Sequence, residues 1–371
     1  MDRLFRPNLI AKTLRTMSNM AVKGPVYFQE EAFNRLNAYL KQYKASKVFI
    51  LVDKNTHRDC LANFLQKLDT AEDFEILEIE AGEINKTIDT CSGLWKALSE
   101  LDADRKSLLI NLGGGVVTDL GGFVASTFKR GISYINVPTS LLAMVDASVG
   151  GKTGVDLGNL KNQIGVINHA EMVLVDSGFL ATLPKNEMRS GLAEILKHGL
   201  ISNENYWHKV TNLSELNLDD LDDIIKESVA IKTKVVTEDP KEDGLRKTLN
   251  YGHTLGHAIE SYFLTHPKKT TLLHGEAIAV GIILATNLSV KLQGFPEEKF
   301  KSISQKLLEI YEKVEFVKDD IQQIIDLMKY DKKNSHGNIN FVLLKDIGTP
   351  VIDCKVPTPL IWAAFEAYKK A

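Results

Sequence analysis

The strongest constraint on the fold is an alternation of strand-like and helix-like segments between residues 46 and 176. Apolar strand-like runs cover residues 47–53, 74–83, 134–140 and 172–176, and residues 107–126 are typical of a buried strand, a glycine turn and a helix. Strands that alternate with helices indicate a parallel sheet covered on both faces. Strand signals stop near Asp176, and helical patterns follow from Pro184 to about Leu292. We therefore predict a Rossmann-like α/β nucleotide-binding domain over residues 1–183 and an all-α metal-binding domain over residues 184–371.

Composition excludes several classes of protein. A chain of 371 residues is too long for one core, and a net charge of −3 gives no basis for nucleic-acid or membrane-surface binding. The three cysteines are scattered and form no CxxC motif, which argues against a disulfide framework and for a reducing cytoplasm. No apolar run is long enough to be expected to cross a bilayer. We predict a cytoplasmic protein with no nucleic-acid or membrane partner.

Glycines and polar side chains lie at the predicted carboxyl ends of the strands, where open parallel sheets bind ligands. Glycine occupies positions 113, 114 and 115, directly after a strand, and Asp119 follows on the next turn. Backbone N–H groups at such a helix start can approach a pyrophosphate, and Asp53 is placed to accept hydrogen bonds from a ribose. A glycine triplet alone usually means only a tight turn. Together with Glu83, Lys86, Thr139 and Ser140 at other strand ends, it favours a dinucleotide.

Four of the nine histidines fall within residues 246–276. His253 and His257 are four residues apart, so on a helix they share a face, and His274 opens the next apolar segment. Two histidines on one helix and a third on the next can form a three-point metal site. Taken alone, the HxxxH spacing is more often a polar pair than a metal site. Thr254 stands where a zinc protease of the HExxH type needs glutamate, which excludes that class.

Two more segments carry charged groups whose interpretation stays open. On the helix predicted over residues 186–201, Glu194, Lys197 and His198 share a surface; a solvated ion pair is the default interpretation, and chelation by Glu194 and His198 is the alternative. Residues 146–165 hold five glycines, and Asp146 stands where a Walker A loop needs glycine. We predict a flexible polar loop that places Lys152, Lys161 and Asn162 on a small anion.

A nucleotide site, a metal site and surplus cations together suit the oxidation of a secondary alcohol on an anionic substrate. A metal lowers the pKa of the alcohol, and a nicotinamide accepts the hydride. Lys232 and Arg246 are cations near the histidines, and Asn250 adds an amide donor. These groups favour a substrate that bears a phosphate and a carboxylate.

The motifs GGGVVTDLGGF, KNQIG, GLAEILKHG, GLRKTLNYGHTLGHAIE and LLHGEA occur in an order that resembles the 3-dehydroquinate synthase family over residues 47–348. The resemblance implies a lyase of the shikimate pathway that requires NAD and zinc, with cobalt as an alternative. Its reaction converts 3-deoxy-D-arabino-heptulosonate 7-phosphate, a phosphorylated keto acid, into 3-dehydroquinate and phosphate. The implied course is transient oxidation by NAD, phosphate elimination, re-reduction and an intramolecular aldol closure favoured by proximity.

The same resemblance implies a role for individual residues. It chooses Glu194, His253 and His274 as metal ligands, where chemistry alone left His257 and His198 equally eligible. The implied phosphate contacts are Lys152, Asn162, Asn250, His257 and Lys333 (or Lys332), with Arg130 reaching in from the neighbouring subunit of a homodimer. Lys232 and Arg246 would hold the carboxylate, and Asp146 and Lys197 would address the ring hydroxyls. NAD would contact Asp53, Glu83, Lys86, Gly114, Gly115, Asp119, Thr139, Ser140, Lys152 and Lys161.

Three alternatives to this assignment remain. Sister sugar-phosphate cyclases share the metal residues but accept substrates without a carboxylate, which the pair Lys232 and Arg246 argues against. A metal-dependent polyol dehydrogenase of the glycerol dehydrogenase type would not need so many cations. A non-enzymatic binding scaffold is disfavoured because the mapped catalytic positions are filled.

Overall fold

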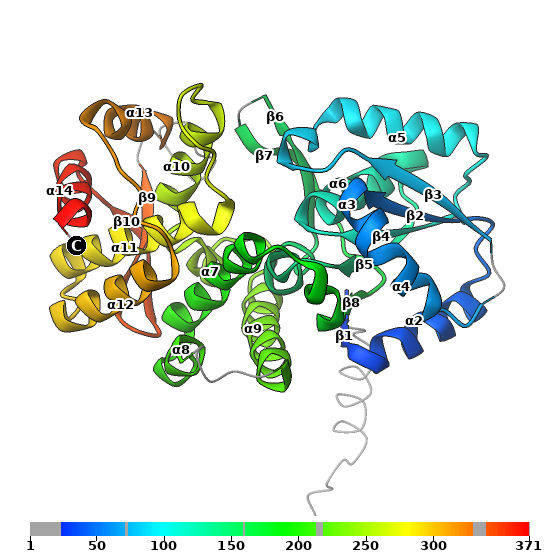
Figure 1. Ribbon diagram of the computed structural model, residues 1–371, viewed down its shortest axis with the longest axis horizontal. Helices are drawn as coiled ribbons and strands as arrows, with labels where there is room; N and C mark the ends of the chain where they lie inside the picture. Colours follow the sequence, from blue (N-terminus) through cyan, green and yellow to red (C-terminus); the bar gives the residue numbers. More distant parts are fainter. Residues whose placement is uncertain (1–23, 71–72, 159, 213–217, 329–338, 371) are drawn as a thin grey trace, which may run out of the picture.

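The two halves of the protein stand side by side and differ in architecture (Figure 1). The computed structural model describes residues 24–70, 73–158, 160–212, 218–328 and 339–370. The N-terminal half is a sheet with helices on both faces, and the C-terminal half is mostly helical. This arrangement confirms the predicted fold class. Lys332 and Lys333 lie outside the described residues.

The sheet of the N-terminal half has six strands, and all their pairings are parallel, as the sequence pattern predicts. Its edge strand β1 was not predicted, because three residues carry too short a pattern. In sheet order β1-β8-β5-β4-β2-β3, the strands are β1 (Val26–Phe28), β8 (Val173–Val175), β5 (Ser133–Pro138), β4 (Leu108–Gly113), β2 (Val48–Asp53) and β3 (Phe74–Ile79).

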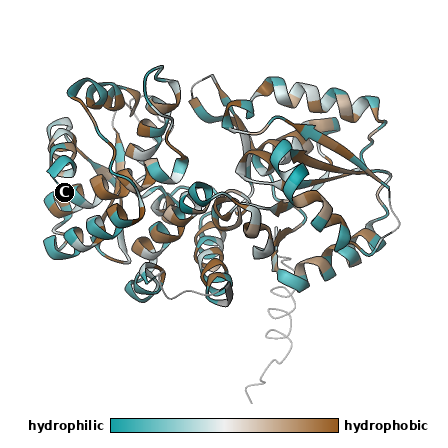
Figure 2. Cartoon of the chain, in the orientation of Figure 1, coloured by the Kyte–Doolittle hydropathy of each residue, from teal (hydrophilic) through white to brown (hydrophobic). Residues whose placement is uncertain are grey.

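Side chains of the central strands are buried on both faces of the sheet. In β2, Val48, Ile50 and Val52 join one hydrophobic cluster, whereas Phe49 and Leu51 join another. This alternation follows from the two-residue period of a strand, and it explains why the run is apolar throughout. Figure 2 shows the strands as hydrophobic ribbons between helices of mixed character. The covering helices are α2 (Gln29–Tyr43), α3 (Lys54–Thr56), α4 (Ala62–Gln66), α5 (Ile88–Glu100) and α6 (Gly115–Thr127).

The order of the strands creates a crevice at one end of the sheet. From β2 the chain goes to β3 on one side, and it then returns to β4 on the other side of β2. The carboxyl ends of β2 and β4 are therefore followed by loops that diverge, and such a switch point is where open α/β sheets bind ligands. Asp53 ends β2 and Gly113 ends β4, so the fold puts the predicted nucleotide residues at this crevice.

Residues 146–165 are more ordered than the predicted flexible loop. After the helical turn Ala143–Ala147, the chain forms an antiparallel hairpin of β6 (Lys152–Leu157) and β7 (Leu160–Ile167). Packing explains the difference, because Thr153, Gly154 and Val155 are buried. Thr153 packs on α6 so closely that a Cβ at Gly122 would lie 2.5 Å from its Cγ2 atom. Two of the five glycines, Gly154 and Gly165, permit close pairing within the hairpin, because a Cβ there would lie 2.4 and 2.2 Å from backbone oxygens.

The C-terminal half is built from helices around one buried helix, with one correction to the all-α prediction. An antiparallel hairpin of β9 (Asn340–Asp346) and β10 (Thr349–Lys355) lies among the helices. The helices are α7 (Lys185–Ser202), α8 (Glu204–Thr211), α9 (Leu218–Glu238), α10 (His253–Thr265), α11 (His274–Gln293), α12 (Glu297–Ile310), α13 (Lys318–Met328) and α14 (Thr358–Lys370).

Helix α11 is the centre of this half, in contact with α7, α10, α12, α14 and β9. By length and composition it passes as a membrane span, which corrects the prediction that no apolar run is long enough to cross a bilayer. However, 78% of its apolar window is buried inside the protein, as expected for the central helix of a helical domain. Its first residue is His274, so the most buried helix begins at a predicted metal ligand.

Candidate active site

Three helices bring the predicted metal ligands together. Glu194 lies in α7, His253 begins α10 after Gly252 (φ 77°), and His274 begins α11. The Oε1 atom of Glu194 lies 3.3 Å from Nε2 of His253 and 3.4 Å from Nε2 of His274. One carboxylate oxygen and two imidazole nitrogens thus face a common point, and this donor set fits zinc or cobalt.

His257 lies beside this cluster on the same face of α10. Its ring centroid is 4.9 Å from that of His253 and 5.8 Å from that of His274, and nitrogens of the three rings lie within 4.8 Å of one another. The shared helix face therefore matches the prediction from the four-residue spacing. Glu194 contacts His253 and His274, and His257 belongs with these two histidines to one group of potential metal ligands.

Glu194 and Lys197 form a buried ion pair, which overturns the default prediction of a solvated one. Their side chains are 0% and 1% exposed. Burial alone raises the pKa of Glu194, but Lys197 and His253 hold it well below its ordinary value. The carboxylate is therefore ionised and ready to bind a cation. The sequence could not show this burial, because i,i+3 pairs on helices are usually at the surface.

A second group of charges lies on the other side of Glu194. Lys232 of α9 donates to the Oδ1 atom of Asp146 at 2.7 Å. Burial raises the pKa of Asp146, but the Lys232 ammonium outweighs it and lowers the pKa to about 2. The guanidinium of Arg246 donates to the carbonyl oxygens of Pro240 (3.0 Å) and Gly150 (3.2 Å). Lys232 and Arg246 are both buried beside the turn that holds Asp146.

His198 is fully buried next to Asp146 and Glu194, within 4.8 Å of their carboxylate oxygens. Its Nδ1 atom lies 2.6 Å from Oγ of Ser228, while its Nε2 atom has no hydrogen-bond partner among the described residues. Burial and the nearby Lys197 lower its pKa to about 3, so the ring is neutral. His198, Asp146 and Glu194 thus form a second group of potential metal ligands beside the histidine cluster.

Lys152 and Asn250 converge on one carboxylate. Lys152 of β6 pairs with Oε2 of Glu242, and Asn250 donates to Oε1 of the same residue at 2.7 Å. Glu242 itself was not assigned from the sequence. Because an anion already bridges these two donors, their position suits the phosphate contact expected of them. Asn162 lies elsewhere: its Oδ1 atom accepts from Lys86 at 2.7 Å, on the nucleotide side.

The nucleotide residues surround the carboxyl ends of β2, β4 and β5. Gly114 precedes α6, and a Cβ there would lie 3.3 Å from Oγ of Ser140, so any larger residue would crowd the crevice. Lys86 is buried and donates to Asp119 at 2.6 Å. Thr139 is also buried after β5. Asp53 currently caps α3 by accepting from the backbone N–H of Thr56 at 2.8 Å. The glycine and the polar side chains at these strand ends therefore form a crevice suited to binding a dinucleotide.

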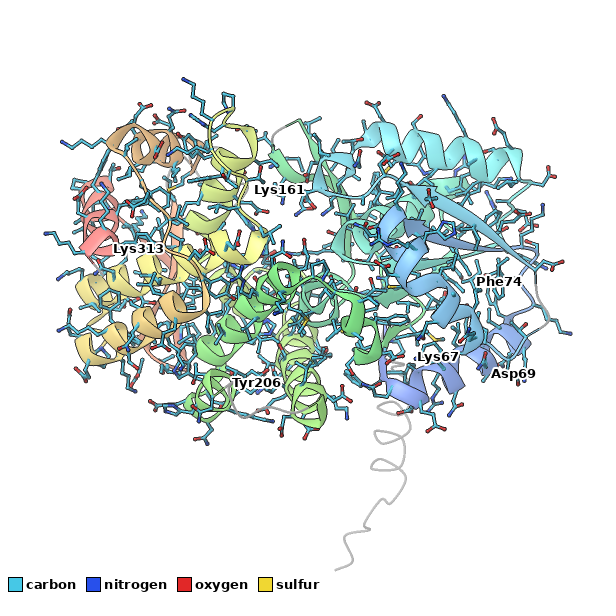
Figure 3. All side chains as sticks on the ribbon, in the orientation of Figure 1. Lys67, Asp69, Phe74, Lys161, Tyr206 and Lys313 are labelled. Carbon is cyan, nitrogen blue, oxygen red and sulfur yellow. The ribbon has the colours of Figure 1, made fainter. Side chains whose placement is uncertain are left out.

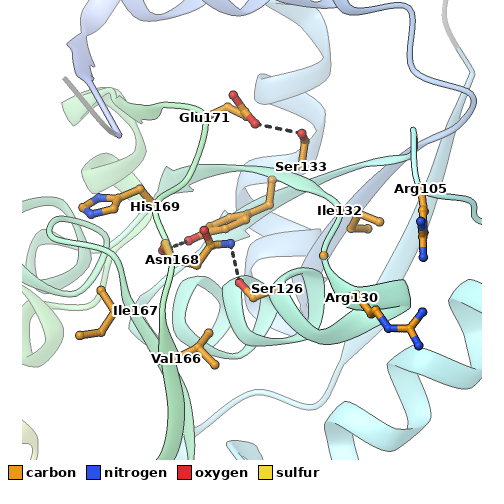
Figure 4. Close-up of a pocket in the computed structure, with 12 residues that line it drawn as sticks. Arg105, Ser126, Arg130, Ile132, Ser133, Val166, Ile167, Asn168, His169 and Glu171 are labelled. Atoms are coloured by element: carbon orange, nitrogen blue, oxygen red, sulfur yellow. Dashed lines mark hydrogen bonds between the residues drawn. The ribbon is translucent and has the colours of Figure 1, made fainter. Parts of the chain in front are cut away.

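Arg130 lies apart from the other predicted residues. It lines a surface cavity of about 520 Å³ with Arg105, Ser126, Asn168 and Glu171, and no metal-cluster residue lines this cavity (Figure 4). Figure 4 shows its side chain beside the segment that leads into β5. Within one chain, the described residues do not bring Arg130 to Lys152 or Asn250. Its predicted role in the site of a neighbouring subunit stays a prediction.

Comparisons with known proteins match both halves of this chain. The family models described as 3-dehydroquinate synthase N-terminal and C-terminal match residues 76–190 and 191–334. The chain belongs to the 3-dehydroquinate synthase family. The 3-dehydroquinate synthase of Parabacteroides distasonis is 43% identical over 340 residues, which cover 91% of this chain and 96% of that protein.

Solved structures of related cyclases resemble the whole fold. The 2-epi-5-epi-valiolone synthase of Streptomyces hygroscopicus, with NAD+ and Zn2+ bound, is 25% identical with a TM-score of 0.81 and covers 94% of this chain and 98% of that one. A 2-deoxy-scyllo-inosose synthase, complexed with carbaglucose-6-phosphate, NAD+ and Co2+, is 26% identical with a TM-score of 0.77. The match covers 92% of this chain and 96% of that one. These neighbours support NAD and a divalent metal as the cofactors of this family member.

One residue of the site was missed by the sequence analysis. Glu260 of α10 is 5% exposed, and its Oε2 atom lies 3.1 Å from Nδ1 of His274. A signal for it was present: it is seven residues after His253 and three after His257, which puts all three on one helix face. Burial alone would lower the pKa of His274, but the carboxylates of Glu260 and Glu194 raise it to about 10.

Proposed function

We propose that this chain performs the reaction of its family with the residues gathered between the sheet and the helices. Members of the 3-dehydroquinate synthase family are lyases that act on 3-deoxy-D-arabino-heptulosonate 7-phosphate. The observation that carries the assignment of the site is the convergence of Glu194, His253 and His274 from three helices. We place the boundary between the two working halves near residue 183, after the last strand of the sheet.

The metal would be held by Glu194, His253 and His274, with His257 beside them. When bound, it polarises a substrate hydroxyl, and NAD accepts a hydride and returns it. Gly114 and Gly115 would let the pyrophosphate approach the start of α6. Asp53, Glu83, Lys86, Asp119, Thr139, Ser140 and Lys161 would line the rest of the nucleotide site. Asn162 joins this group rather than Lys152, given its contact with Lys86.

The substrate would lie between the two halves, with its anionic ends on separate cations. Lys152 and Asn250, which now share Glu242, would take the phosphate together with His257. Lys232 and Arg246 would take the carboxylate, and Asp146 and Lys197 would contact the ring hydroxyls. The carboxylates of Asp146, Glu194, Glu242 and Glu260 already accept from cations or amides, which supports the leaving phosphate itself as the base for proton removal. Holding both ends would also favour aldol closure.

The deciding experiment measures phosphate release from the heptulosonate phosphate. We expect release that requires catalytic NAD, stops with a chelator and resumes with zinc. NADH accumulation with glycerol, and no phosphate release, would instead show a polyol dehydrogenase. Release from sugar phosphates that lack the carboxylate, but none from the heptulosonate, would move the chain to the sister cyclases.

Arg246→Gln tests the carboxylate assignment. A charged hydrogen bond contributes about 1.5–3 kcal/mol, so we expect kcat/KM to fall ~10- to 100-fold, mainly through KM. The matched control is Lys247→Met, because Lys247 is the adjacent cation and pairs with Asp353 at the surface. Equal KM values for the two variants, with folding verified by circular dichroism, would remove Arg246 from the substrate site.

The oligomeric state and location are further parts of this proposal. We propose a homodimer in which Arg130 of each chain completes the site of the other. The position of Arg130 in a surface cavity whose lining does not include Lys152 supports this arrangement. Mixing an Arg130→Ala variant with a Lys152→Met variant of this chain would restore part of the activity if sites are shared between subunits. We also propose a cytoplasmic location, supported by three free cysteines, two of them buried.

A further inference from the structure

The carboxylate of Glu260 is held at both of its oxygens. Its Oε2 atom lies 3.1 Å from Nδ1 of His274, and its Oε1 atom accepts from Nζ of Lys161 at 2.6 Å. The Glu260 side chain is 6% exposed and that of Lys161 is 14% exposed, so water competes little for either contact. A carboxylate that is held at both oxygens cannot rotate without breaking one of these two contacts.

Lys161 comes from the other half of the molecule. It lies in β7 of the hairpin, and Figure 3 labels it where the hairpin faces α10. The same ammonium lies 2.9 Å from Oε1 of Glu83, which follows β3 on the nucleotide side. A continuous chain of contacts therefore runs from Glu83 through Lys161 and Glu260 to His274. It crosses from the sheet-bearing half to the metal cluster.

The geometry at His274 matches what a metal-binding histidine requires. With Nδ1 directed at Glu260, its Nε2 atom faces Glu194. A hydrogen bond from the distal ring nitrogen to a carboxylate fixes the tautomer and the ring orientation, and it makes the other nitrogen a better donor to a metal. Lys161 balances the Glu260 charge, which would otherwise be costly so far from water. The position of Glu260 therefore depends on Lys161, and the orientation of His274 depends on Glu260.

We propose that Glu260 is the positioning residue for the metal ligand His274, and that Lys161, reaching across from the hairpin, holds Glu260 in place. Metal affinity therefore depends on a residue of the nucleotide-binding half that touches no metal ligand. This inference rests on the proposed metal site. It adds a role for Glu260 and a role for Lys161 that is separate from any contact with the nucleotide.

Zinc affinity of the full-length protein, measured without NAD by competition with a chromophoric chelator, tests the inference. Loss of such a supporting carboxylate typically weakens metal binding ~10- to 100-fold, and we expect that range for Glu260→Ala and about 10-fold for Lys161→Met. Lys161→Arg keeps the charge and should restore most of the affinity. The matched control is Lys269→Met. Lys269 also pairs with a buried carboxylate, that of Asp320 at 2.6 Å, but this pair is not part of the metal cluster.

The outcomes separate this inference from the metal site itself. Weak binding in Lys161→Met and wild-type affinity in Lys269→Met, with similar thermal stability in both, would support the role of Lys161. Equal zinc affinity in the two variants would overturn it. If the wild-type protein binds no zinc, or if His274→Ala binds it as tightly as wild type, the metal site is wrong and the positioning role falls with it.

Discussion

Replacing His253 by alanine should remove the bound metal and lower phosphate release by about 10³-fold. A metal contributes several kcal/mol to transition-state stabilisation, and each 1.36 kcal/mol is a factor of ten in rate, so loss of about 4 kcal/mol gives this value. The substitution leaves Glu194 paired with Lys197, and it therefore creates no unpaired buried charge. Metal content by mass spectrometry and activity with saturating NAD are the two measurements.

His208→Ala is the control for this variant. Its side chain is 67% exposed on α8, and the structure places it outside the cluster. It should keep both metal and activity. A His253→Ala protein that retains one zinc per chain would contradict the assignment and would return His257 or His198 to consideration as a ligand.

Gly281→Ala should cause the largest loss of stability. A Cβ at this position would lie 2.1 Å from the carbonyl oxygen of Gly252 and 2.8 Å from the backbone nitrogen of Gly256. Both atoms are backbone, so the helices α10 and α11 must move apart. Overpacking of this kind costs about 1–3 kcal/mol and sometimes more. Because the two helices carry His253 and His274, we expect the metal affinity to fall as well.

Urea denaturation of the metal-free protein measures this effect, with Gly93→Ala as the control. Gly93 lies inside α5, and a Cβ there would meet no atom within 4 Å. Alanine is favoured over glycine in a helix by roughly 0.5–1 kcal/mol, so this control should be neutral or slightly stabilising. Equal free energies of unfolding for the two variants would show that the helix crossing tolerates a methyl group.

The sequence predicts the fold well because its signals are local. The central strands are largely apolar, and β2 shows why: its residues from Val48 to Val52 alternate between two cores, and all five are apolar. The hairpin β6–β7 was missed for the opposite reason. Its glycines and lysines are typical of a mobile loop, and only the packing of Thr153 against α6, which is remote in sequence, gives it order.

The site is less predictable than the fold because its residues converge through tertiary packing. Spacing places His253 and His257 on one face, but it does not say which of them Glu194 approaches. The burial of the Glu194–Lys197 pair depends on helices that come later in the chain, and the same holds for the contact between Glu260 and Lys161. Only the family resemblance chose among the ligands, and the choice of His253 and His274 over His257 stays a prediction.

The hairpin β6–β7 pairs with no other strand of the described chain, and this independence bears on how such enzymes diverge. Strand register in the six-stranded sheet does not depend on it, so residues at its tip can be exchanged, inserted or deleted without rearranging the sheet core. Lys152, Lys161 and Asn162 all lie on this hairpin. Natural selection, or a protein engineer, can therefore alter Lys152 to meet a new sugar phosphate, whereas Lys161 is constrained by its contact with Glu260 beside the metal ligand His274.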